Sequence, residues 1–295
     1  MLQQTQASRV CEYFVRFVAT FPDIFTLAAA PPDGVSEMWQ GLGYYRRARF
    51  LHQCSKIIVS QHKGIVPDKP DILEQLPGIG RSTANAIVAQ TYDLPFPILD
   101  ANAIRVISRL YGVTQSIEIS QVKKQLWDYA EGLTPQKSPA LYTQGIMDLG
   151  TIGCTKTRPA CHCCPIAQWC VARKNDLVHL IPVKKKPTKK IVSFFDFLLY
   201  KTEQEVLLER RPPAGIWPGL WCLPHLDPSQ TEPYVLVQSI KHELSHRKLT
   251  IRIFEHASEP KINKVQDSQQ RLVPIASLAE YGLPSPIQKV LSHLS

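Results

Sequence analysis

Apolar residues recur every three or four positions near the start of the chain, at Val10, Phe14, Phe17, Val18 and Phe21. This spacing is typical of the apolar stripe of an amphipathic helix. The residues before it, MLQQTQ, contain no clear start signal, although helices usually begin with a side chain that satisfies their first amides. We therefore expect the sequence to begin inside a longer helix.

Helical spacing continues to about residue 150 with little of the alternation expected of strands. Pro and Gly residues divide this region into segments, at positions 31–32, 41–43, 67–70, 77–80 and 95–97. Residues 182–190, PVKKKPTKK, have a composition that neither continues a helix nor forms a buried core. We expect a basic linker over 181–191.

Short runs of apolar and β-branched residues follow this linker, at 194–200, 205–211 and 248–254. Leu249, Ile251 and Ile253 alternate with polar residues, as in a half-buried strand. The predicted architecture is multidomain, with an all-α domain over 1–150 and an α+β domain over 192–295.

Composition and charge narrow the possible partners. With 295 residues and 44% hydrophobic content, the chain can form two cores. The sequence contains neither the roughly 18 uninterrupted apolar residues of a membrane span nor the layout of a signal peptide, so we expect a cytosolic protein without membrane contact. The net charge is +9, of which residues 201–295 carry only +1. This uneven basic charge favours a phosphate-rich partner without excluding other substrates.

Four cysteines lie in one short window, with the spacing C-x6-C-x2-C-x5-C: Cys154, Cys161, Cys164 and Cys170. In a reducing cytosol such a group indicates a metal site rather than disulfides. Four thiolates in one compact loop favour an iron–sulfur cluster over zinc, which usually takes two separate C-x2-C turns.

A tight turn precedes the helix predicted to begin near Arg81. Its sequence, LEQLPGIGRSTANAI at 73–87, places Gly78 and Gly80 where backbone amides can point outward at a helix amino terminus. Such a turn suits a DNA phosphate and reads no sequence, but an ordinary turn between two helices has the same pattern. Over the whole stretch it resembles the helix-hairpin-helix DNA-binding motif.

Asp100, in PILDANAIRV at 97–106, stands at the start of another predicted helix. An Asp at this position ordinarily caps the helix through the amide of Asn102 or Ala103. A carboxylate beside a substrate could instead serve catalysis. The two roles are compatible, because the amides that cap a carboxylate also favour its charged form.

Together these residues resemble one family, the adenine DNA glycosylases of the MutY type within the helix-hairpin-helix glycosylase superfamily. The resemblance is carried by MLQQTQ at 1–6, WQGLGYYRRAR at 39–49, LPGIGRSTANAI at 76–87, FPILDANAIRV at 96–106, QGIMDLG at 144–150, the four-cysteine loop, and RPPAGIWPGLWCLP at 211–224. It implies a helix-hairpin-helix domain over 1–150, a 4Fe–4S cluster loop over 151–180 and a Nudix-like domain over 192–295.

The resemblance also implies a function, base-excision repair of double-stranded DNA. The family removes adenine opposite 8-oxoguanine or guanine by hydrolysis of the N-glycosidic bond. Asp100 would stabilise or attack the sugar cation, with Asn102 holding it in place and Ser82 lining the active site. Gln144 would line the adenine pocket. Cys154, Cys161, Cys164 and Cys170 would hold the cluster.

Contacts with DNA are implied for further residues. Gln4 and Tyr44 would push into the base stack, and the hairpin glycines Gly78 and Gly80 would hold the backbone. Ser245 and His246 would read the lesion, in a loop where the family usually has Phe-Ser-His. Here Leu244 replaces the Phe, which removes an aromatic ring and weakens this assignment.

The general acid of the family stands two positions ahead of the residue equivalent to Met1, and the sequence therefore lacks it. Glu12 is no substitute, because it would lie about 20 Å further along one helix. We expect residues 1–295 to bind DNA with base excision severely reduced or absent, and we expect a mis-assigned start rather than a natural truncation.

Alternative functions remain open at this stage. An endonuclease III-like glycosylase with lyase activity would need a Lys where this chain has Ser82. A lesion-binding protein without catalysis, or a zinc-binding DNA module, would also suit parts of the pattern. The Nudix-like domain lacks the acidic helix that binds magnesium in Nudix hydrolases, so we expect no phosphohydrolase activity. We expect a nucleoid-associated monomer that contacts replication or mismatch-repair proteins.

Overall fold

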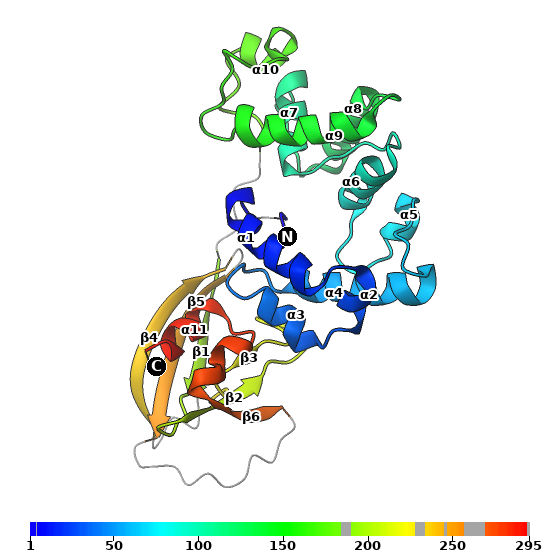
Figure 1. Ribbon diagram of the computed structural model, residues 1–295. Coiled ribbons are helices and arrows are strands. Elements are labelled where there is room, and N and C mark those ends of the chain that lie inside the picture. The colour runs from blue at the N-terminus through cyan, green and yellow to red at the C-terminus, as the bar shows by residue number, and fades with distance from the viewer. Residues whose placement is uncertain (4, 184–189, 228–233, 245–246, 257–268, 294–295) are drawn as a thin grey trace. The chain divides into compact units, whose positions relative to one another are not determined.

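The computed structural model describes residues 1–3, 5–183, 190–227, 234–244, 247–256 and 269–293 (Figure 1). Its chain divides into two compact units, Met1–Gly64 with Thr188–Ser295 and Ile65–Pro187. Most of the predicted linker, 184–189, lies outside the described residues. Among the described residues, the helices are too short or too polar to cross a membrane.

The unit Ile65–Pro187 is helical. Its elements are α5 (Pro70–Leu73), α6 (Arg81–Tyr92), α7 (Ala101–Tyr111), α8 (Ser120–Leu133), α9 (Pro139–Asp148), the π-helix η1 (Leu149–Gly153), the 3-10 helix η2 (Ala167–Trp169) and α10 (Val171–Lys174). Helix α7 supplies much of the core, because Val106 and Ile107 pack with Leu126 of α8 and Ile146 of α9. The site residues of this unit therefore project from well-packed helices.

The other unit begins with four helices, α1 (Ala7–Thr20), α2 (Ile24–Ala29), α3 (Pro32–Met38) and α4 (Arg46–His62). Helix α1 confirms the predicted amphipathic segment, but it begins at Ala7, after an extended Gln6 that makes no side-chain cap. The expectation that the sequence begins inside this helix is therefore wrong. Its stripe is only partly buried. Val10 and Phe17 are in the core, whereas Phe14 is 56% and Val18 is 42% exposed.

The second part of this unit contains two three-stranded sheets. One has the order β1 (Ile191–Leu198), β5 (Arg247–His256) and β4 (Tyr234–Glu243), with β1 parallel and β4 antiparallel to β5. The other has β3 (Trp221–Cys222), β2 (Glu205–Arg210) and β6 (Gln270–Pro274), and is antiparallel. The predicted strand alternation is confirmed, since Leu249, Ile251 and Ile253 are at most 1% exposed.

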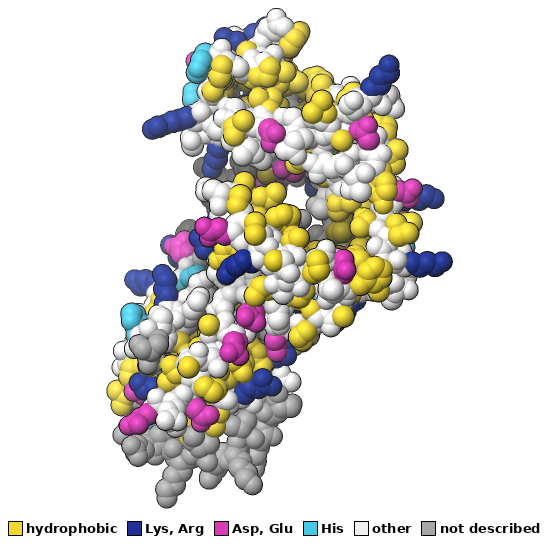
Figure 2. Space-filling view, viewed as in Figure 1, with side chains coloured by type: hydrophobic (Ala, Val, Ile, Leu, Met, Phe, Trp, Pro, Cys, Tyr) yellow, Lys and Arg dark blue, Asp and Glu magenta, His cyan; other side chains and the backbone are white. Residues whose placement is uncertain are grey.

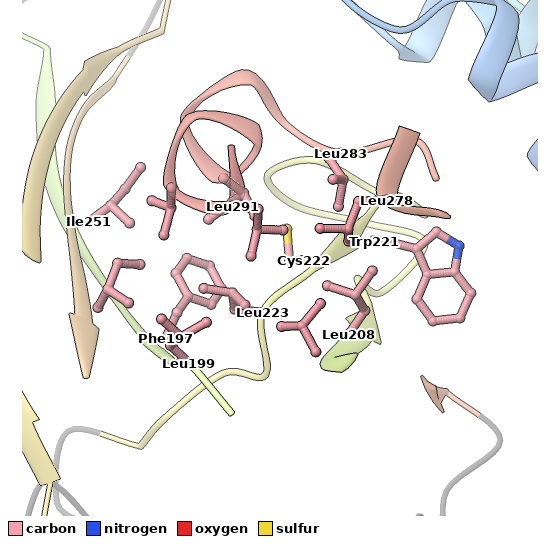
Figure 3. Packing of buried hydrophobic residues seen from close by; sticks show 14 of the residues in the cluster. Phe197, Leu199, Leu208, Trp221, Cys222, Leu223, Ile251, Leu278, Leu283 and Leu291 are labelled. Atoms are coloured by element: carbon pink, nitrogen blue, oxygen red, sulfur yellow. The ribbon is translucent and has the colours of Figure 1, made fainter. Parts of the chain in front are cut away.

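A hydrophobic core joins the two sheets to the 3-10 helix η4 (Ile275–Glu280) and to α11 (Ser285–Leu291). Phe197 and Ile251 contribute from one sheet, and Leu208 and Cys222 from the other (Figure 3). Leu291 of α11 closes the same cluster. This arrangement confirms the expected α+β class of the second domain.

Polar contacts tie the first helices to the sheet part of the same unit. Arg210 forms an ion pair with Asp33 of α3 at 3.0 Å, and the Tyr45 hydroxyl donates to the carbonyl of Leu283 at 3.1 Å. Residues far apart in the sequence therefore share one unit, which the order of the sequence motifs did not indicate.

His52 of α4 makes the stability of this unit depend on pH. The side chain is 5% exposed, and its Nε2 has no hydrogen-bond partner. Burial, with Lys56 nearby, lowers the pKa of His52. The unfolded chain therefore takes up a proton more readily than the folded chain, so stability is lost as the pH falls through the ordinary His value of about 6.5. We expect the free energy of unfolding to decrease between pH 7 and pH 5.

The measurement is denaturant unfolding across this pH range, with His52→Gln compared with the original chain. His52→Gln should show a smaller loss, because it cannot take up a proton. His179→Gln is the matched control, because His179 is exposed. Parallel pH curves for the original chain and His52→Gln would contradict this assignment.

Candidate active site

Asp100 lies at the start of α7, as the sequence predicts. Its backbone is extended, and its Oδ1 accepts a hydrogen bond from the amide of Ala103 at 2.8 Å. The positive end of the helix stabilises the negative charge of this carboxylate. The helix cap is thus confirmed, and it places a partly buried carboxylate at a fixed point.

Helix α6 holds the extended segment that leads to Asp100. The Ser82 hydroxyl accepts a hydrogen bond from the amide of Leu99 at 3.0 Å, next to Asp100 in the chain. Asn85, one turn later and 4% exposed, donates through Nδ2 to the carbonyl of Pro97 at 2.7 Å. Both contacts fix the backbone before α7, and Asn85 is a site-positioning residue that the sequence analysis missed.

Asn102 connects α7 to the π-helix η1. Its Nδ2 donates to the Thr151 hydroxyl at 3.2 Å, and its Oδ1 accepts from Arg105 Nη2 at 3.0 Å. Arg105 also donates to the carbonyls of Gly150 and Cys154, the latter at 2.7 Å. The side-chain amide of Asn102 thus faces η1. Asn102 can therefore keep Asp100 in place only through the backbone at the start of α7, to which both residues belong.

Gln144 of α9 lies in a chain of polar contacts on an exposed surface. Its Oε1 accepts from Gln90 of α6 at 3.0 Å, and its Nε2 donates to Asp148 Oδ1 at 2.8 Å. These two contacts orient the amide. Asp148 was not a sequence candidate, although it stands in the QGIMDLG segment one helical turn after Gln144.

The predicted turn before α6 is present. Gly78 has a φ of 79°, a conformation that favours glycine, and Gly80 precedes the helix without a side-chain cap. Arg81 lies 3.9 Å from the Trp127 ring centroid. On the face shown in Figure 2, Lys and Arg side chains stand singly among acidic and apolar ones. A turn of this kind can bind an anion through its backbone amides.

The four cysteines of the predicted cluster line one pocket, with a cavity volume of about 20 Å³. Burial and the neighbouring thiols of Cys154, Cys164 and Cys170 raise the pKa of Cys161, which Arg109 partly opposes. Within the described part of the chain, no three His, Cys, Asp or Glu side chains are grouped to hold a metal ion. The cysteines therefore share a pocket without forming a ready-made site for a single ion.

Two parts of the chain match families of known proteins. Residues 1–131 match the HhH-GPD superfamily of base excision DNA repair proteins, and residues 197–293 match the NUDIX domain. An adenine DNA glycosylase of Buchnera aphidicola subsp. Schizaphis graminum (strain Sg) is 33% identical over 99% of this chain and 88% of its own length. That of Buchnera aphidicola subsp. Acyrthosiphon pisum (strain APS) is 31% identical over 99% and 87%. The chain belongs to the adenine DNA glycosylase family.

Two solved structures share the helical fold of this chain. A thermostable thymine-DNA glycosylase superposes with a TM-score of 0.53 at 26% identity, over 59% of this chain and 80% of its own. A non-covalent endonuclease III–DNA complex gives a TM-score of 0.51 at 22% identity, over the same shares of the two chains. At this identity, the similarity to the endonuclease III complex shows a shared fold and does not indicate a shared function.

Adenine DNA glycosylases of this type commonly carry a 4Fe–4S cluster. The chain presents its four cysteines on one pocket, so the thiol donors that such a cluster needs lie together. The pocket also contains the Arg109 guanidinium, whose charge suits an anionic group. The residues present therefore fit the group.

The remaining predicted site residues lie in the other unit or outside the described residues. Tyr44 is 55% exposed and has a positive φ of 50°. Arg47 lies 5.4 Å from its ring centroid and donates to the carbonyl of Gly43 at 3.1 Å. Gln4, Ser245 and His246 lie outside the described residues, and their assignments stay predictions.

Proposed function

We propose that this member of the family excises adenine opposite 8-oxoguanine or guanine in double-stranded DNA. The observation that carries the proposal is the fixed carboxylate of Asp100 at the positive end of α7. Ser82 and Asn85 hold the backbone just before it. A carboxylate held this way can stabilise positive charge without reorganising during the reaction.

In the proposed reaction the bond between adenine N9 and sugar C1′ breaks, and its electron pair leaves with the base. A proton supplied to the adenine ring lets the base leave as a neutral molecule. The Asp100 carboxylate would stabilise the cation at C1′ or bond to it, and a water molecule would then add to C1′ and release its proton. Asn102 and Ser82 would keep Asp100 in position.

Recognition of the adenine is assigned to the surface around Gln144. Its amide is oriented by Gln90 and Asp148, which presents both donor and acceptor groups to a base edge. Asp148 adds acceptors for an exocyclic amino group. We therefore extend the predicted adenine pocket from Gln144 to include Asp148.

Binding of the duplex is assigned to two kinds of contact. The turn at Gly78 and Gly80 would bind a phosphate through the amides that open α6. Tyr44 and Gln4 would enter the base stack beside the lesion, while Ser245 and His246 would contact the 8-oxoguanine. The exposure of the Tyr44 ring is in keeping with such a role.

The cofactor is assigned to the pocket of Cys154, Cys161, Cys164 and Cys170. A bound 4Fe–4S cluster would cross-link the loop through its four thiolates. The chain's own contribution is to keep η1, η2 and α10 around one pocket. Arg105 links η1 to α7 through the carbonyls of Gly150 and Cys154, which places the cysteine loop next to the helix that Asp100 caps.

A single-turnover assay tests the proposed reaction, with duplexes that contain adenine opposite 8-oxoguanine, guanine or thymine. We expect base release from the first two duplexes, at a much reduced rate when residues 1–295 are tested alone, and none from the third. Borohydride should trap no strong adduct, because Ser82 offers no amine for a Schiff base with the sugar. A strong adduct would instead support the lyase, and lesion affinity without base release would support a binding protein.

The position of the general acid gives a separate prediction. In the family pattern, a Glu and one apolar residue stand directly before the segment Met-Leu-Gln-Gln-Thr, so a polypeptide that carries these two residues ahead of residues 1–295 should release the base about 10²–10⁴-fold faster than residues 1–295 tested alone. Both chains should bind the lesion duplex. Equal rates for the two chains would show that another group delivers the proton.

A further inference from the structure

Arg109, in the last turn of α7, has an unusual environment for a charged side chain. It is 2% exposed. Its Nε donates to the carbonyl of Ile181 at 3.0 Å, and its Nη2 to that of Lys156 at 3.2 Å. Its Nη1 donates to the carbonyl of Thr155 at 2.7 Å and reaches Cys154 Sγ at 3.2 Å. The guanidinium is thus fully enclosed by the cysteine loop and the segment that follows it.

The charge of Arg109 is not balanced by a carboxylate. The ion pairs found among the described residues do not include Arg109. Three carbonyls and the Cys154 sulfur accept its hydrogen bonds. The neutral carbonyls leave its charge uncompensated, and a buried unpaired charge is costly. The remaining groups able to carry negative charge in its pocket are the thiols of the four cysteines.

We propose that Arg109 is the counter-charge of the group held by these cysteines, and that its positive charge determines how firmly the pocket retains an anionic iron–sulfur cluster. This inference rests on the proposed cofactor. Arg109 is a positioning residue in this account, because it acts on the cluster and not on the DNA. Its charge should also favour the reduced state of the cluster, since reduction adds negative charge beside it.

The pocket contains a natural comparison. Arg173 also lines it, but its side chain is exposed to solvent, where water screens its charge. Arg105 donates to the backbone carbonyl of Cys154 rather than to a sulfur. Removing the charge of Arg109 should therefore affect the cluster far more than removing that of Arg173.

The test uses the full chain, purified with its cluster, and compares Arg109→Gln, Arg109→Lys and Arg173→Gln. Iron per chain, absorbance near 400 nm and the rate at which a chelator bleaches that absorbance are measured. We expect Arg109→Gln to lose its cluster about 10- to 100-fold faster than the original chain. Arg109→Lys keeps the charge and should stay closer to the original, and Arg173→Gln should match it.

Equal losses in Arg109→Gln and Arg109→Lys would overturn the proposal, because they would show that only the hydrogen bonds to the carbonyls matter. An original chain without iron would refute the cofactor itself, whereas iron retained in both the original chain and Arg109→Gln would refute only the role of Arg109. Pulsed EPR of the original chain, labelled with ¹⁵N-arginine and oxidised by ferricyanide, does not depend on an Arg109 variant that folds. A ¹⁵N coupling to the cluster that persists in Arg173→Gln is expected, and its absence would contradict the proposal.

Discussion

An Asp100→Asn variant should bind a duplex that carries a cationic pyrrolidine in place of the target sugar at least about 100-fold more weakly than the original chain. The pyrrolidine imitates the sugar cation of the proposed reaction. Its binding needs the carboxylate but no leaving base. The result is therefore independent of the group that delivers a proton to the leaving base.

The substitution separates the two roles of Asp100. Asn caps a helix about as well as Asp, so Asp100→Asn should keep the bond to the amide of Ala103 and fold normally. Asp100→Ala removes the cap as well, and it should lower the free energy of unfolding by about 1 kcal/mol. Loss of affinity for the cation in both variants, with loss of stability in Asp100→Ala alone, would assign the charge to the reaction and the cap to the fold.

Binding is measured by titration of each variant against the pyrrolidine duplex and against a duplex with a neutral sugar analogue at the same position. The neutral duplex controls for DNA binding, and all variants should bind it alike. If Asp100→Asn bound the cationic duplex as tightly as the original chain does, another group would have to stabilise the cation.

Local chemistry in the sequence was enough to predict the elements that carry the site. Asp100 caps α7 because the preference of Asp for this position is intrinsic to the helix terminus. Gly78 adopts its positive φ because the turn before α6 requires it. Leu249, Ile251 and Ile253 are buried because their alternation specifies one face of a strand. In each case the cause lies within a few residues.

Contacts between distant residues could not be read in the same way. Asn85 reaches the carbonyl of Pro97, and Arg109 reaches that of Ile181, and neither pair has a local pattern that predicts it. Phe14 belongs to the apolar stripe of α1, yet its side chain is exposed. Periodicity shows which residues share a face of a helix, but it does not show whether another element covers that face. The π-helix η1, which follows α9 directly and packs against α7, is another feature that the sequence analysis did not predict.

Gly150, inside η1, gives the second large prediction. A Cβ placed on it would lie 2.6 Å from Asn102 Cβ and 3.2 Å from Asn102 Cα. The backbone of α7 cannot move aside without shifting the helix that Asp100 caps. A Gly150→Ala variant should therefore lose about 1–3 kcal/mol of unfolding free energy and bind the pyrrolidine duplex more weakly.

Gly145 provides the matched control, because it lies in the adjoining helix α9 and a Cβ placed on it would have nothing within 4 Å. Gly145→Ala should be neutral or should stabilise the helix by about 0.5–1 kcal/mol. Thermal or denaturant unfolding, followed by the same titration, compares the two variants. Equal stability and equal binding of Gly150→Ala and Gly145→Ala would contradict this prediction. The close approach of η1 to Asn102 would then not hold the start of α7, and only Ser82 and Asn85 would position Asp100.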